Sequence, residues 1–324
     1  MSARLALSLT LVAACAWAED QPAQDPTTYD LKPRYALDAE LEGEASLNLE
    51  LTVRMQVPAK NIDHRSLQAQ EIVRRFRDKV TSVAGGKVAA VTRTYLEAIE
   101  RQRLPGSQKY ERLESPLHGR TLTVGLDAEG KRTVGVEGKP ALTAKDTEHE
   151  VYTERYEAAL PDSPVAVGDT WSWSGARLRR AIGNGFGESP EGKIDCRFVE
   201  VKDEVLDPEL TPDAAPEAYA LIQVDLETEG RMGPQPDSPS MTCHLTGTLW
   251  YSLAERKLAK VELQGQAHIK SVEREDGVEL TITASGPLKI AKRFWFPRKP
   301  EPPAGDAPTD PETGLPTPPE RPGR

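Results

Sequence analysis

Two cysteines in the second half of this 324-residue chain have the side chains whose chemistry is easiest to place. Cys196 and Cys243 each alternate with apolar neighbours, so both are expected to point from a strand toward an apolar interior. An exported chain that lost its first residues would keep only these two cysteines, and an oxidising compartment favours their pairing. We therefore predict a disulfide between Cys196 and Cys243, with two buried free thiols as the alternative.

Other reactive residue types do not form a recognisable catalytic or metal-binding pattern. The five histidines include no pair at the spacing of metal ligands, and no Gly-x-Ser-x-Gly string is present. The stretch 187–194 resembles a phosphate-binding loop, but it lacks the Ser or Thr after Lys193 that would bind magnesium. We predict no catalytic residue, no metal and no cofactor, although an enzyme with catalytic groups gathered from distant loops stays an alternative.

The N-terminus has the pattern of an export signal. Arg4 precedes an apolar run over 5–14, and the small-x-small string 16–18 predicts cleavage after Ala18. The string 12–15 also resembles a bacterial lipobox, which would make Cys15 a lipidation site instead. Either route predicts a periplasmic, extracellular or membrane-anchored protein.

Charge and hydropathy exclude two classes of partner. The net charge is −10, so the chain as a whole has no electrostatic reason to bind nucleic acid or an anionic membrane. Beyond the first twenty residues no apolar run approaches the length of a transmembrane helix, so no transmembrane span is predicted.

The stretch 35–57 is the clearest structural signal, because every odd position is apolar or glycine and the even positions are mostly polar. This alternation is typical of a strand with one buried face. The stretch is too long for a straight strand in a compact domain, so we expect a bend or hairpin near Gly43, or one long curved strand.

Residues 63–103 allow two interpretations. Their apolar spacing favours a helix over 66–83 followed by a strand over 87–101, whereas Gly85 and Gly86 are also a hairpin signal. Alternation over 122–136 predicts a hairpin, and the segments 241–253, 259–269 and 278–290 predict a three-stranded meander. The side chains expected to face an apolar ligand are Leu47, Leu49, Leu51, Leu249, Tyr251, Val261 and Leu263.

The string Leu-Pro-x-x-Pro-Val-x-Val-Gly-Asp-x-Trp over 160–171 resembles an uncharacterised family of secreted bacterial β-rich proteins. The stretches 117–124 and 247–253 are similar to other recurring strings of that family. The resemblance implies an envelope location and a large antiparallel sheet, and it implies no assigned activity. A weaker similarity, resting on pattern alone, is to the lipoprotein-carrier half-barrels, which bind acyl chains in an apolar concavity.

These observations predict a mainly β fold, either a large curved antiparallel sheet or a half-barrel, with one or two helices. We expect a signal peptide over 1–18, a flexible leader over 19–33, a β-rich domain over 34–296 with two halves that join near 160, and a disordered proline-rich tail over 297–324.

The predicted function is a non-catalytic exported envelope protein that binds a lipid or other apolar ligand in a concave sheet. The alternative is a structural or protein-interaction module, with an envelope protein as its partner, whose core is filled by its own side chains.

Overall fold

The computed structural model describes residues 27–84, 87–104, 106–126, 132–136, 142–143, 147, 155–182, 190–206, 215–233, 235, 237–275 and 278–296. The predicted signal peptide, most of the predicted leader and the predicted tail lie outside these residues. So do the turn residues of the hairpin over 122–136.

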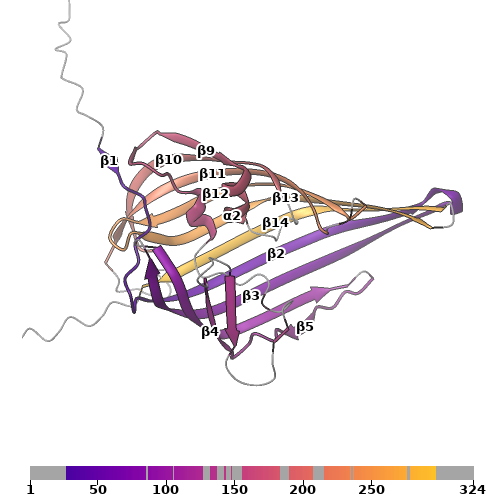
Figure 1. Ribbon diagram of the computed structural model, residues 1–324. Coiled ribbons are helices and arrows are strands. Elements are labelled where there is room, and N and C mark those ends of the chain that lie inside the picture. The colour runs from indigo at the N-terminus through magenta and orange to yellow at the C-terminus, as the bar shows by residue number, and fades with distance from the viewer. Residues whose placement is uncertain are drawn as a thin grey trace, which may run out of the picture.

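One antiparallel sheet of twelve strands dominates the fold, so the predicted mainly β class and large curved antiparallel sheet are confirmed. Its strands follow the order β7-β6-β4-β3-β2-β14-β13-β12-β11-β10-β9, and β5 pairs with β4 beside β6 (Figure 1). The strands are β2 (Glu40–Val57), β3 (Ile62–Ala84), β4 (Lys87–Arg103), β5 (Glu111–Glu114), β6 (Thr121–Leu126), β7 (Arg132–Val136), β9 (Thr170–Ser174), β10 (Glu191–Glu204), β11 (Glu217–Arg231), β12 (Ser240–Ser252), β13 (Lys257–Glu275) and β14 (Val278–Trp295).

Short elements complete the described part of the chain. A two-stranded sheet joins β1 (Thr28–Tyr29) to β8 (Val165–Ala166). A 3-10 turn η1 (Pro58–Lys60) connects β2 to β3 at the far tip of the longest strands (Figure 1). A second 3-10 turn η2 (Arg155–Ala159) and the helix α2 (Gly175–Ile182) lie against one face of the sheet, which we call the inner face.

The predicted turn at Gly43 is wrong, because β2 passes through this residue as one continuous strand and the alternative of a long strand holds. Gly43 is needed there for packing. A Cβ atom at this position would lie 2.5 Å from Cζ of the Phe76 ring, which covers the glycine from the neighbouring strand. Pro58 ends β2 and begins η1, since proline cannot continue a ladder.

The predicted helix over 66–83 is also wrong, since this segment lies within β3, and the strand predicted over 87–101 is confirmed as β4. β3 is hydrogen-bonded to β2 along one edge and to β4 along the other. Phe76 and Val80 alternate with outward-facing residues at the strand period, and β3 and β4 pair antiparallel up to Ala84 and Lys87, in agreement with the hairpin interpretation. Gly85 and Gly86 themselves lie outside the described residues. Two strand partners therefore override a local helical spacing.

The predicted flexible leader is wrong for its described part, residues 27–33. Leu31 is fully buried in the core, and the hydroxyl group of Tyr251 donates a hydrogen bond to the carbonyl of Lys32 at 2.8 Å. Together with the pairing of β1 and β8, these contacts bind the segment to the end of the sheet.

Two hydrophobic clusters lie on the inner face. The first cluster covers β10–β14 and includes η2 and α2, and the second covers β3, β4 and β6 around Tyr95 and Leu122. Phe294 of β14 belongs to the second cluster, and β14 pairs with β2, so the sheet continues without a break between the two clusters.

Candidate ligand site on the inner face

Residues 155–164 and the helix α2 cover the inner face of the sheet at the first hydrophobic cluster, and we call these two parts together the plug. Its attachment centres on the carbonyl oxygen of Ala159 in η2. Nε1 of Trp171 donates to this oxygen at 2.7 Å, Nε1 of Trp173 donates at 3.1 Å, and Sγ of Cys196 lies 3.7 Å away. The two tryptophans share one face of β9, and together they fix the plug to the edge of the sheet.

Arg177 of α2 makes a second attachment. Its guanidinium group stacks on the Trp173 ring at 3.5 Å and donates to the carbonyl of Ala158 at 2.7 Å. It also donates to the carbonyl of Leu160 and to the carboxylate of Asp162. A single arginine thus ties the end of η2 to α2.

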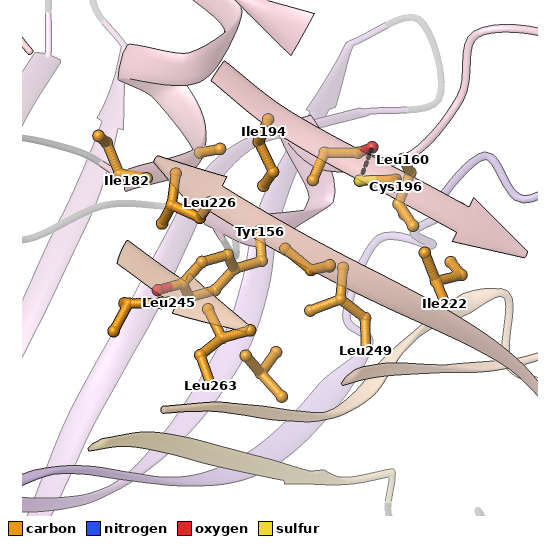
Figure 2. Close-up of a cluster of buried hydrophobic side chains, with 14 of the residues drawn as sticks. Tyr156, Leu160, Ile182, Ile194, Cys196, Ile222, Leu226, Leu245, Leu249 and Leu263 are labelled. Atoms are coloured by element: carbon orange, nitrogen blue, oxygen red, sulfur yellow. Dashed lines mark hydrogen bonds between the residues drawn. The ribbon is translucent and has the colours of Figure 1, made fainter. Parts of the chain in front are cut away.

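The side chains predicted to face a ligand all lie on the inner face, but most of them are packed into or against the first hydrophobic cluster, to which the plug contributes. Leu249, Tyr251, Val261 and Leu263 are buried in the first cluster. Figure 2 shows Leu249 and Leu263 in one cluster with Tyr156, Leu160 and Ile182. Leu47 and Leu49 are half-buried against this cluster, and Leu51 is 5% exposed.

A cavity of about 30 Å³ lies where the two clusters meet, and we call it the seam cavity. Its apolar walls come from β2, β3, β4, the start of β13 and the end of β14, so both clusters contribute to it. The lining residues are Tyr35, Leu41, Asp78, Val80, Val88, Val91, Arg93, Glu157, Lys257, Leu258, Phe294 and Phe296.

Each charged side chain that lines the seam cavity has a hydrogen-bond partner there, with one exception. Arg93 donates to both carboxylate oxygens of Asp78, at 2.7 and 2.6 Å, and both side chains are largely buried. The hydroxyl group of Tyr35 donates to the carboxylate of Glu157. The exception is Lys257, which is 7% exposed.

The amino group of Lys257 contacts aromatic rings. Nζ lies 5.2 Å from the centre of the Tyr35 ring and 5.0 Å from that of Phe296. Burial lowers the pKa of Lys257 below its usual value, and the negative charges of Glu255 and Glu157 oppose this shift. The site therefore holds a cation in a poorly hydrated, partly aromatic environment.

The charged residues of this site were not among the predicted site residues, although the alternation pattern contains part of the signal for them. Asp78 lies two positions from both Phe76 and Val80, so alternation places its charge among inward-facing apolar residues. Arg93 has the same relation to its own apolar neighbours on β4. Lys257 could not be placed in this way, because an irregularity in the pairing of β12 with β13 shifts the register just beside it.

A second hollow of about 400 Å³ lies at β2, β3 and β4 near Tyr110. Asn48 and Glu50, whose side chains leave the outer face, line it together with Arg101, and Arg101 forms an ion pair with Glu71 at 2.7 Å. Its lining is mainly polar, in contrast to the walls of the seam cavity.

The predicted disulfide is wrong, because Cys196 and Cys243 are both free and buried. Cys196 pairs with Val224 on one side of β11, and Cys243 pairs with Thr228 on the other side, four positions further along. Two strand spacings give about 10 Å and four residues add about 13 Å. A disulfide requires Cα atoms within about 7 Å, so facing the same interior is not enough.

Among the described residues, no group of three or more His, Cys, Asp or Glu side chains could hold a metal ion. None of the helices in the described ranges is long and apolar enough to cross a membrane.

Comparisons with known proteins identify no family for this chain. No family model matches it, and no curated protein is similar to it, so the resemblance over 160–171 stays a prediction. Among solved structures, a lipovitellin chain from a structure of lipid-protein interactions in lipovitellin is similar with a TM-score of 0.34 and 6% identity. That likeness covers 81% of this chain and only 26% of the lipovitellin chain. A DUF1329 family protein from Desulfovibrio piger has a TM-score of 0.11 and 9% identity over 77% of this chain and 85% of that one. Both TM-scores are too low to establish a common fold.

Proposed function

We propose that this protein is a non-catalytic, exported binding protein that takes an apolar ligand with an acyl chain at the seam cavity. The observation that carries the proposal is the cavity itself. Leu41, Val88 and Phe294 give it apolar walls from three strands of one sheet, at the point where the two hydrophobic clusters meet. Concave apolar sites with a few polar groups are the usual form of small-ligand sites.

The volume of the seam cavity sets the part of the ligand that it holds. A space of about 30 Å³ takes the end of a ligand but not a whole acyl chain. Phe296 forms one wall, is only half-buried and directly follows β14, so it is the wall best placed to move aside for the chain. The ligand end would be held between the clusters while its chain leaves past Phe296.

A specific observation favours the alternative of an interaction module without a ligand. The first hydrophobic cluster is filled by the protein's own side chains, including Leu160, Leu178 and Ile182 of the plug. In this alternative the inner face serves stability alone, and the outer face contacts an envelope partner.

Titration with hexanoate, decanoate and hexadecanoate, together with native mass spectrometry of protein from the producing cell, tests the proposal. We expect at least one of these ligands to bind, and binding to be lost in Leu41→Trp, which fills the cavity. Leu37→Trp is the matched control, because Leu37 is 60% exposed and does not line the cavity. If no ligand binds and no lipid co-purifies, the interaction module is the better description.

Export is tested separately by the intact mass of the mature chain. We expect either loss of residues 1–18 or a diacylglyceryl group on Cys15. A mature chain that keeps Met1 in an envelope fraction would contradict both forms of processing.

A further inference from the structure

We propose that Lys257 binds the carboxylate head group of the ligand, so that the seam cavity selects fatty acids over neutral amphiphiles. This inference rests on the proposed function and names the ligand class for the same site. It follows from a buried cation, from the pairing of its charged neighbours and from the size of the cavity.

The amino group of Lys257 has three N–H donors and, among the described residues, no hydrogen-bond acceptor or ion-pair partner. The contacts with the Tyr35 and Phe296 rings stabilise its charge but accept no conventional hydrogen bond. A buried charge without hydrogen bonds is costly, so this position favours any ligand that brings an acceptor.

The neighbouring charged groups already have partners. Asp78 receives both hydrogen bonds of Arg93, and Glu157 receives the hydroxyl group of Tyr35. Glu157 and Glu255 act on Lys257 through space, yet neither forms an ion pair with it among the residues that the structure describes. Lys257 therefore has donors available to a ligand in this cavity.

The cavity fits a small anion with an apolar substituent. A carboxylate is compact, accepts hydrogen bonds with two oxygens and continues directly into methylene groups that match the walls of Leu41 and Phe294. Lys257 is only 7% exposed and lies beside two aromatic rings, and low exposure to water strengthens the attraction between unlike charges.

The test compares decanoate with decanol in the wild type, Lys257→Met, Lys257→Arg and a control. Lys257→Met removes the charge and keeps an unbranched apolar side chain. Lys260→Met is the matched control, because Lys260 lies on the same strand and contacts the Trp250 ring at 4.6 Å, outside the seam cavity. Circular dichroism checks that each variant is folded.

We expect the wild type and Lys260→Met to bind decanoate roughly ten- to a hundredfold more tightly than decanol, the range of a charge-assisted hydrogen bond. Lys257→Met should bind both ligands equally, and Lys257→Arg should keep part of the preference. Glu157→Gln should bind decanoate more tightly than the wild type, because it removes a nearby negative charge.

Two results would overturn the assignment of Lys257 while the proposed function stands. One is equal binding of decanoate and decanol by the wild type, and the other is an unchanged preference in Lys257→Met. Tighter binding of decyl phosphate than of decanoate would overturn the carboxylate as the head group. Binding of neither decanoate nor decanol would instead contradict the proposed function itself.

Discussion

At the scale of single residues, Lys257 is the costly feature of this fold. A lysine that is 7% exposed carries a charge only against a desolvation penalty, and aromatic contacts offset part of that penalty. Proteins commonly hold such energetically unfavourable groups at functional sites. The stability of the ligand-free protein should therefore depend on the protonation of this one amine.

The first prediction is a pH dependence of stability that Lys257 contributes. Because burial lowers the folded-state pKa of Lys257 below 10.5, the unfolded chain binds this proton more tightly. Lys257 therefore lowers the free energy of unfolding by its full amount at pH values below its folded-state pKa. This destabilisation is lost as the pH rises from the folded-state pKa to 10.5. Compared with Lys257→Met, the wild type should gain free energy of unfolding between neutral pH and about pH 10, measured by urea denaturation. A difference that does not change with pH would contradict this prediction.

The second prediction concerns the two buried thiols. Desolvation raises the pKa of Cys196 to about 12 and that of Cys243 to about 12, so both stay protonated and unreactive in the folded protein. We expect iodoacetamide to label both after unfolding without reductant, and to label neither readily before unfolding. Unfolded protein treated with reductant is the control. If the unfolded protein were labelled only after treatment with reductant, the two cysteines would be joined by a disulfide.

At the scale of elements, the plug decides how much of the inner face is open. Its attachment depends on few contacts, because the carbonyl oxygen of Ala159 accepts both indole N–H groups and Arg177 binds the neighbouring carbonyls. Buried carbonyl groups that lose their donors are costly, which makes these contacts more important than their number suggests.

The third prediction is a non-additive effect of removing the two indole donors. Trp171→Phe and Trp173→Phe each leave the other donor on the carbonyl of Ala159, so each single change should cost little through this bond. The double variant leaves this carbonyl with only the weak S–H donor of Cys196, so it should lose about 1–3 kcal/mol of unfolding free energy, more than the sum of the single changes. Trp250→Phe is the control, because its indole donates instead to Glu204. Additive effects in urea denaturation would show that the shared carbonyl does not couple the two rings.

At the scale of the whole molecule, one sheet joins two hydrophobic clusters. The pairing of β2 with β14 connects the first strands of the chain to the last, so the two halves that the sequence suggested share a single ladder. The inner face is apolar along both clusters. The outer face carries ion pairs such as Arg77 with Glu42 at 2.5 Å and Lys260 with Glu262 at 2.9 Å.

The fourth prediction is that both clusters unfold together. Leu122 lies in the second cluster and Leu245 in the first, and both are fully buried. Leu122→Ala and Leu245→Ala should each lower the unfolding free energy by about 2–5 kcal/mol and shift one common transition. Circular dichroism and native-state hydrogen exchange measure this in urea. If Leu122→Ala destabilised only the strands around its own cluster, the halves would be independent units.

The sequence by itself determined which way the side chains of most strands point. Alternation placed Leu47, Leu249 and Val261 on one common face, and it oriented both cysteines toward the interior. Side-chain direction in a strand is a local property with a period of two residues, so it can be predicted without knowledge of the neighbouring strands.

Only the tertiary structure decided what each face meets. The pairing of β3 with two neighbours settled a segment whose spacing also suited a helix, and the register across β11 placed Cys196 and Cys243 too far apart for a bond. The plug packs against the face that alternation had marked as open to a ligand, and a register shift in the pairing of β12 with β13 lies beside the buried Lys257. Strand order, register and coverage arise from contacts between residues far apart in the chain, and a local pattern does not contain them.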